Sequence, residues 1–379
     1  MLSAQLQGSA ATRPPFRADH VGSFLRPKYL LDARDSEARG ALTAGALREV
    51  EDRAIREIVK FQQDLGLHGI TDGEFRRTYF HVDFLTQLDG VVEKGVMSVK
   101  FHKADGDIDF APPVLQVSGR VRRSHPIQRR DFEFLQSVTT QTPKVTIPSP
   151  TMLHFRSGRG GISHAAYPDL EIFYQDIAAA FAQEIADLAA AGCTYLQLDD
   201  TNLAYLCDPV QREAARKRGD DPDELPLRYA RLINAAIAGH PPEMRICIHL
   251  CRGNFRSSWA AEGGYEPVAR VLFNELDVDG YFLEYDDARS GDFEPLRHVP
   301  RGKAVVLGLV STKLNELETM DELRRRIDQA ERYLPLDQIC LSPQCGFSST
   351  VHGNDVAVSM QAKKLKLVID TARAIWGYR

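Results

Sequence analysis

Strand-like segments alternate with helix-like segments along most of this chain, and that alternation restricts the possible folds more than any other feature. The strand-like segments are rich in β-branched and apolar residues and occupy 19–22, 67–72, 144–147, 194–199, 245–250, 280–284, 304–309 and 338–341. Long helical patterns separate them, among them 44–65, 170–191, 226–237, 267–276, 320–334 and 355–375. Strands that alternate with helices in this way predict an α/β fold, the (β/α)8 or TIM barrel.

Two segments depart from the alternation. Residues 1–15 are mostly small and polar, which predicts a flexible arm ahead of a single domain over 16–379. Within 91–123 the alternating runs VVEKGVMSVKF and PPVLQVSGRV flank the charged turn KADGDID. This pattern predicts a β-hairpin inserted after the second strand of the barrel.

Composition excludes several classes of protein. The 379 residues carry a formal net charge of −5, and 43% of them are hydrophobic. No apolar run is long enough to span a membrane, and the start of the chain lacks the basic and apolar regions of a secretory signal. The acidic balance gives no reason to expect nucleic acid or an anionic membrane as a partner. We therefore expect a cytoplasmic enzyme with small-molecule substrates, and a homo-oligomer remains open.

The chain has six cysteines. A disulfide framework belongs to short secreted chains, so reduced thiols are expected here. Four of the six are expected to be structural or core residues: Cys193, Cys207, Cys247 and Cys340. The other two lie where a strand has just ended, which is where a barrel places its active site.

These two cysteines belong to a set of four residues that can bind zinc. His249 and Cys251 stand two apart at the end of one strand, so their side chains point to the same face. Glu284 closes the next strand, and Cys345 follows the last strand. Three strand ends thus bring sulfur, nitrogen and carboxylate ligands to one rim, and these are the groups that zinc accepts in a tetrahedron.

The charge of this set indicates its chemistry. Two thiolates and a carboxylate place three negative charges around a divalent ion, which makes the metal a weak Lewis acid and favours activation of a substrate thiol. Each residue also has a structural explanation. His249 or Cys251 can be a core side chain, Glu284 a solvated charge at the rim, and Cys345 a packed thiol in a loop.

Further carboxylates stand at strand ends. Asp72 and Glu74 end the second strand, and Asp199 and Asp200 end the fourth. Such groups can bind an ammonium, orient a hydroxyl or move protons. For Asp200 the capping of a helix N-terminus is an equally good explanation.

Groups that can bind an anion stand nearby. Ser23 and the backbone around Gly22 close the first strand, and Lys313 follows the seventh. Lys313 can donate a proton or bind an anion, or it can be a solvated lysine. Arg76 and Arg77 can bind an acidic substrate group, and surface ion pairing is their alternative.

At these residues the sequence resembles the catalytic barrel of the cobalamin-independent methionine synthases, and most closely the short single-barrel members of that superfamily. The matching stretches are RADHVGSFLRP, ITDGEFRR, LQLDD, HLCRGN, FLEYDD and LSPQCGF. The resemblance covers the chain from about residue 16 to its end.

The resemblance implies a zinc-dependent transfer of a methyl group from a 5-methyltetrahydrofolate-type donor to homocysteine, giving methionine. It implies zinc ligands at His249, Cys251, Glu284 and Cys345. It also implies an ammonium-binding carboxylate at Asp199 and a carboxylate-binding turn at Val21, Gly22 and Ser23. We expect Glu74 or Lys313 to manage protons.

Three departures from the family pattern affect the choice of substrates. The family's second, N-terminal barrel has no counterpart in this length. An ammonium-binding glutamate is replaced by Val82, for which the neighbouring Asp83 can substitute. A proton-donating histidine is replaced by Lys313. Alternatives are therefore alkyl transfer to another thiol, as in the opening of an epoxide with coenzyme M, or transfer from a corrinoid methyl donor. Less favoured are a zinc hydrolase and a purely structural zinc.

Overall fold

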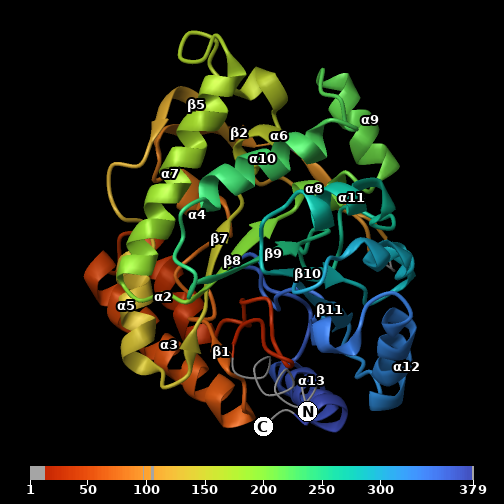
Figure 1. Ribbon diagram of the computed structural model, residues 1–379. Coiled ribbons are helices and arrows are strands. Elements are labelled where there is room, and N and C mark those ends of the chain that lie inside the picture. The colour runs from red at the N-terminus through yellow and green to blue at the C-terminus, as the bar shows by residue number, and fades with distance from the viewer. Residues whose placement is uncertain (1–12, 97, 104–105, 378–379) are drawn as a thin grey trace.

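A parallel sheet forms the centre of the computed structural model, which describes residues 13–96, 98–103 and 106–377 (Figure 1). Six strands pair in the order β12-β11-β10-β9-β8-β7, and every neighbouring pair is parallel. The strands are β7 (Val145–Pro148), β8 (Tyr195–Asp200), β9 (Arg245–Leu250), β10 (Gly280–Glu284), β11 (Ala304–Val310) and β12 (Ile339–Pro343). The α/β class with a parallel sheet is therefore confirmed.

Shorter pairings continue the sheet at both edges. The strand β1 (Gly69–Ile70) pairs in parallel with β6 (Thr142–Pro143), which leads directly into β7. At the other edge, Ala18 forms an isolated parallel bridge with Leu341 of β12. The segment predicted as a strand at 19–22 therefore forms no strand, because the single bridge lies one residue before it, at Ala18.

Helices cover the outside of the sheet, as the amphipathic patterns predict (Figure 1). The long ones are α2 (Lys28–Ala38), α3 (Ala44–Leu65), α5 (Arg129–Val138), α7 (Leu170–Ala190), α9 (Pro209–Lys217), α10 (Leu225–Ile237), α11 (Glu266–Asn274), α12 (Met320–Glu331) and α13 (Val358–Trp376). Local signals set their ends. The Thr43 hydroxyl accepts from the Ala46 amide at the start of α3, and Gly66 ends that helix with a φ of 96°.

Antiparallel strands lie between β1 and β6 in the chain. The strand β2 (Asp89–Val96) pairs with β5 (Pro113–Arg122), and between them β3 (Val99–Phe101) pairs with β4 (Ile108–Phe110). The sequence predicted one hairpin over 91–123, whereas the structure has one antiparallel pair nested inside another. A backbone bridge between His102 and Trp259 fixes the inner pair against the loop after β9.

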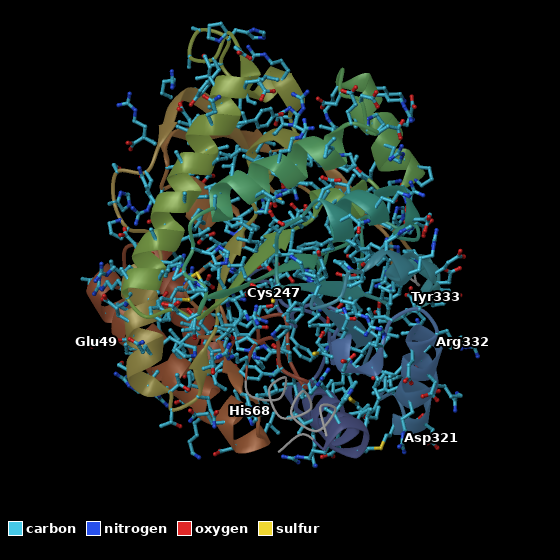
Figure 2. The ribbon with its side chains drawn as sticks, viewed as in Figure 1. Glu49, His68, Cys247, Asp321, Arg332 and Tyr333 are labelled. Atoms are coloured by element: carbon cyan, nitrogen blue, oxygen red, sulfur yellow. The ribbon has the colours of Figure 1, made fainter. Side chains whose placement is uncertain are left out.

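The interior of the sheet is filled by apolar side chains and by polar side chains that have partners. Cys247 is fully buried near the centre of the molecule, whereas Glu49, Asp321 and Arg332 lie at its outside (Figure 2). Cys193, Cys207 and Cys340 are also buried, and all six cysteines are free. The four cysteines predicted to be structural therefore occupy core positions.

The arm predicted at 1–15 falls for the most part outside the described residues. Of its described part, Pro15 is buried, and its carbonyl accepts a contact from the Cys340 thiol at 3.8 Å. None of the helices in the described part of the chain combines the length and the apolar character needed to cross a membrane.

Candidate metal centre

Three strand ends deliver the four predicted zinc ligands to one place. His249 lies in β9, Cys251 follows that strand directly, Glu284 ends β10 and Cys345 follows β12. One ligand atom from each of the four lies within 4.8 Å of the others. The Sγ atoms of Cys251 and Cys345 are 3.6 Å apart. Two sulfur ligands at the usual zinc distance in a tetrahedron are about 3.8 Å apart, so the spacing suits such an ion.

Polar atoms of this cluster make no hydrogen bonds within the described protein. His249 is 2% exposed, and neither of its ring nitrogens makes a hydrogen bond within the described residues. The same is true of Oε2 of the fully buried Glu284. Buried polar groups are normally hydrogen-bonded, so unsatisfied atoms that converge on one point indicate a missing ligand. The donor set and its unsatisfied atoms therefore fit a metal ion.

Hydrogen bonds and cations hold the cluster in position from outside. Oε1 of Glu284 accepts from the backbone amide of Arg252 at 3.2 Å, and its Oε2 lies 3.6 Å from Nη2 of Arg289. The neighbouring Cys251 thiol, with His249 and Lys313, lowers the pKa of Cys345 well below its ordinary value.

Lys313 stands beside the cluster and does not line the pocket in front of it. Its side chain is 5% exposed, and Nζ has no hydrogen-bond partner among the described residues. Its charge favours the thiolate forms of Cys251 and Cys345. The structure thus places this predicted catalytic lysine beside the candidate metal ligands and outside the lining of the pocket.

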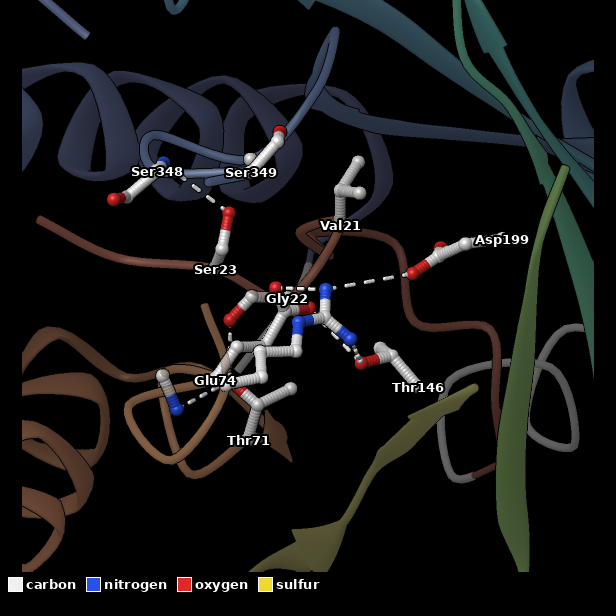
Figure 3. Close-up of polar contacts among 12 residues, drawn as sticks. Val21, Gly22, Ser23, Thr71, Glu74, Thr146, Asp199, Ser348 and Ser349 are labelled. Atoms are coloured by element: carbon white, nitrogen blue, oxygen red, sulfur yellow. Dashed lines mark hydrogen bonds and ion pairs between the residues drawn. The ribbon is translucent and has the colours of Figure 1, made fainter. Parts of the chain in front are cut away.

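The predicted turn at Val21, Gly22 and Ser23 forms one wall of the pocket (Figure 3). Gly22 has a φ of +145°, and a Cβ there would lie 2.5 Å from Oε1 of Glu74. Glycine is therefore required for the turn to pass so close to this carboxylate. The Ser23 hydroxyl accepts from the Ser348 amide at 3.2 Å, which joins the turn to the loop that carries Cys345.

Two predicted carboxylates enter the same pocket from other strand ends (Figure 3). Glu74 accepts from the Thr146 hydroxyl at 2.9 Å and forms an ion pair with Arg77. Nη2 of Arg77 also lies 3.7 Å from Oδ2 of Asp199. Burial raises the pKa of Glu74 to about 7 despite the guanidinium beside it. Burial likewise raises the pKa of Asp199.

Asp83 does not join this group. Its carboxylate accepts from the backbone amides of Thr78 and Tyr79, at 2.8 Å each, and it lines a neighbouring cavity instead. Val82 is buried at the start of α4 (Val82–Leu85). The geometry therefore gives no support to Asp83 as a substitute for the ammonium-binding glutamate of the family pattern.

Other predicted candidates have structural partners. The Oδ1 atom of Asp200 accepts from the Leu203 amide at 2.8 Å, which is the capping alternative stated for it. His20, which precedes the turn at Val21 and is not one of these candidates, contacts the Gly69 carbonyl, and burial lowers its pKa to about 4. Asp72 accepts from the Glu74 amide, and Arg76 forms ion pairs with acidic residues of α3 and α5.

Aromatic residues that the sequence analysis did not single out form the apolar wall of the pocket. Phe110 of β4 stacks on Phe255 with ring centroids 3.9 Å apart, and Phe101 of β3 packs against both. The antiparallel strands thus reach the metal centre through their aromatic side chains. Only tertiary structure brings β3 and β4 to the loop after β9 that carries Phe255, so no local sequence signal identifies these aromatic residues as part of the site.

Arg156 and Tyr205 also line the pocket without having been predicted. Arg156 follows α6 (Met152–Phe155), in the loop after β7, and Tyr205 ends α8 (Asn202–Tyr205), just after β8. The rule that strand ends face the active site, extended further into these two loops, would have found both.

Comparison with known proteins places this architecture in context. Residues 16–373 match the family described as the cobalamin-independent synthase catalytic domain. A Bacillus subtilis (strain 168) protein named "Uncharacterized protein YxjH" is 44% identical, over 96% of each chain. A 5-methyltetrahydropteroyltriglutamate–homocysteine methyltransferase from Bacillus velezensis is 25% identical, and the match covers 97% of this chain but 44% of that protein.

A solved structure agrees with these matches. A crystal structure from Listeria monocytogenes, whose name assigns it provisionally to the vitamin-B12 independent methionine synthases, superposes with a TM-score of 0.76 at 36% identity. It covers 96% of this chain and 99% of its own.

Proposed function

Because this chain belongs to the family of cobalamin-independent synthase catalytic domains, we propose that it is a zinc-dependent methyltransferase that alkylates a thiol. Homocysteine is the leading acceptor and a 5-methyltetrahydrofolate-type molecule the leading donor. The observation that carries this proposal is the convergence of His249, Cys251, Glu284 and Cys345, with ligand atoms within 4.8 Å of one another.

We infer that the strands close into a (β/α)8 barrel around this site. The bridge between Ala18 and Leu341 joins the first segment to β12. On its other side, the Phe24 amide donates to the Gly73 carbonyl at 3.2 Å, and the His20 ring contacts the Gly69 carbonyl at 2.9 Å. These contacts support closure between the first and the last strands of the sheet. In such a barrel the active site lies at the carboxyl ends of the strands.

The ligand set suits thiol chemistry better than hydrolysis. Zinc held by these four residues would favour the thiolate form of a substrate thiol at neutral pH. Hydrolytic zinc sites use neutral or less anionic ligands that keep a bound water acidic. The negative charge of these four ligands thus supports attack by a substrate sulfur on a methyl group.

Residues of this chain would orient the acceptor. Asp199 opens into the pocket and offers a carboxylate to an ammonium, while Val21 and Ser23 line the adjacent wall with a turn suited to a carboxylate. An amino acid held by its two charged groups would direct its side chain toward Cys251 and Cys345. Homocysteine has this shape, with a thiol at the end of the side chain.

Proton transfer completes the reaction. The new sulfur–carbon bond forms as the bond from the methyl carbon to the donor nitrogen breaks, and that nitrogen then requires a proton. Glu74 lines the pocket and has a pKa of about 7, so it can hold this proton at neutral pH. Lys313 would act by offsetting the negative charge of the four proposed zinc ligands.

Metal analysis combined with spectroscopy tests the proposal. We expect purified protein to hold about one zinc per chain, as a four-ligand site requires. X-ray absorption should show added sulfur coordination when homocysteine is supplied, and methionine should form when 5-methyltetrahydrofolate is also present. The mechanism would be refuted if the protein held no stoichiometric zinc, or if the coordination of its zinc did not change when thiols were added. If the zinc gains sulfur coordination but no methionine forms, the thiol chemistry is supported and this donor is excluded.

A further inference from the structure

Arg156 is a positively charged side chain in the pocket wall that has no anionic partner among the described residues. It lines the same pocket as His249 and Cys251. Within the described residues, its guanidinium takes part in no hydrogen bond and no ion pair. Burial lowers the pKa of Arg156, and no neighbouring carboxylate offsets this effect. The side chain is thus a cation held at the site without a partner from the protein.

The other cation of the pocket wall is already engaged. Arg77 forms an ion pair with Glu74 and lies 3.7 Å from Asp199. These two carboxylates are the acidic side chains that line the pocket, apart from the metal ligands behind it. Arg77 is therefore neutralised from within the protein, whereas Arg156 is available to an incoming molecule.

The surroundings of Arg156 supply no negative charge. Its neighbours in the pocket wall include His81 and Tyr205. Burial, and then the charges of Arg156 and Arg77, hold the pKa of His81 well below its ordinary value, so the ring is neutral. Burial raises the pKa of Tyr205, so its hydroxyl stays protonated and can donate a hydrogen bond.

Tyr205 connects Arg156 with the metal centre. Its hydroxyl lies 3.0 Å from the position that a Cβ on Gly253 would occupy, two residues beyond Cys251. Within the described chain this hydroxyl also has no hydrogen-bond partner. A guanidinium and a phenol hydroxyl that share one wall make a donor pair suited to a carboxylate.

A guanidinium keeps its charge at any physiological pH, and removal of that charge from water costs free energy unless an anion is paired with it. The apolar rings of Phe101, Phe110 and Phe255 line the same pocket and offer no such anion. A bound molecule with a negative group would satisfy Arg156, while its uncharged part would contact these rings.

We propose that Arg156, assisted by the Tyr205 hydroxyl, binds a carboxylate carried by the alkyl donor. The inference rests on the proposed function, in which the turn at Val21 and Ser23 already serves the carboxylate of the acceptor. An amino acid acceptor has one such group, so the second anion site belongs to the second substrate. Both a folate-type donor and a sulfonium derived from an amino acid carry a carboxylate.

Paired donors separate these sources. Dissociation constants of zinc-loaded full-length protein would be measured by isothermal titration for 5-methyltetrahydrofolate and for S-methylmethionine. Each is compared with a counterpart that lacks the carboxylate, a 5-methyltetrahydropterin and trimethylsulfonium. The variants are Arg156→Gln, Arg156→Lys and, as a control, Arg270→Gln at an exposed position of α11. Homocysteine binding is measured on every variant.

We expect one donor to bind the wild-type protein at least about tenfold more tightly than its carboxylate-free counterpart, as a charge-assisted hydrogen bond provides. In Arg156→Gln this difference should disappear, in Arg156→Lys it should be partly restored, and homocysteine binding should stay unchanged. The donor that shows the effect identifies the source of the carboxylate.

Three results would overturn the inference. The first is a carboxylate preference that persists in Arg156→Gln. The second is an equal loss of homocysteine binding, which assigns the guanidinium to the acceptor. The third is no binding of either donor. The zinc and homocysteine measurements judge the thiol chemistry separately, so failure of this inference is distinguishable from failure of the proposed function.

Discussion

Buried charges occur in two regions of this protein, and the two regions treat them differently. In the interior of the sheet, Nζ of the fully buried Lys144 lies 3.2 Å from Oδ1 of Asp19 and donates to the His20 carbonyl. Oδ2 of the same aspartate accepts from the Tyr195 hydroxyl at 2.7 Å. At the strand ends and in the loops that follow them, in contrast, the buried His249 and Lys313 and the half-buried Arg156 lack such partners in the described protein.

The contrast separates structural charges from functional ones. A buried charge that is fully paired within the protein leaves nothing for a ligand to satisfy. A buried polar group without a partner lowers stability unless something outside the chain completes it. His249 and Arg156 line one pocket and Lys313 stands beside the candidate metal centre, so groups without partners mark this region of the molecule. Buried polar atoms elsewhere in the described chain, such as those of Arg218 and Gln338, also lack hydrogen bonds.

The largest expected effect comes from two cysteines of the same strand region. Cys251→Ser should lose bound zinc and lower the rate of methyl transfer by about a thousandfold or more, since a zinc ligand is replaced by a poor one. Cys247 lies within β9, on the same face as Cys251 but deeper in the fold, and is fully buried. Cys247→Ser should therefore keep zinc and activity. Metal content and turnover of the folded fractions measure both. If Cys251→Ser retained zinc and activity, Cys251 would not differ in role from the core residue Cys247.

Two lysines test the comparison next. Lys144→Met should lower the free energy of unfolding by about 3–5 kcal/mol, because it leaves Asp19 buried without its partner. Lys313→Met should leave the stability within about 1 kcal/mol, since Nζ has no partner to abandon. The rate of methyl transfer by Lys313→Met should fall at least about tenfold, because a positive charge near the four proposed zinc ligands is lost. Denaturant titrations and turnover per zinc-loaded molecule check both.

The opposite pattern would contradict the comparison. If Lys313→Met unfolds more easily than Lys144→Met while it retains full activity, the lysine at the strand ends is structural. Lys144→Arg provides a matched control for the interior, because it keeps the charge and changes only its shape and its packing against Tyr195.

The periodic parts of the fold could be predicted from sequence because their signals are local. Apolar spacing located α3 and α7, and the strands β8 to β11 match the predicted segments to within a residue or two. The four residues proposed as zinc ligands followed from one further rule, that strand ends face the active site. Each of these steps needs only residues close together in the chain.

The remaining parts depend on contacts between distant segments. The role of Asp83 could not be predicted from the sequence. Its carboxylate accepts from the backbone amides of Thr78 and Tyr79, and the positions of these amides depend on the turn that precedes α4. The aromatic wall depends on a bridge between His102 and Trp259. The lack of a partner for Arg156 is a property of the whole pocket, and no sequence pattern records it.

The smallest expected effect concerns Asp199 and Asp200, which end β8 side by side. Alternation along the strand turns Asp199 into the pocket and Asp200 toward the Thr151 hydroxyl, 2.6 Å away, and the Leu203 amide. Asp199→Asn should raise the KM for homocysteine about tenfold and leave stability nearly unchanged, because one charge-assisted hydrogen bond to the substrate is lost. Asp200→Asn should lower the free energy of unfolding by about 1 kcal/mol and leave KM unchanged, because it weakens a cap.

Steady-state kinetics and thermal unfolding on both variants, with the double variant included, decide this last point. The two effects should add, because one carboxylate acts on the substrate and the other on the protein. Equal changes in KM for the two variants would mean that the acceptor site extends behind the strand. In that case the direction in which a carboxylate leaves the end of β8 would not separate a structural charge from a functional one.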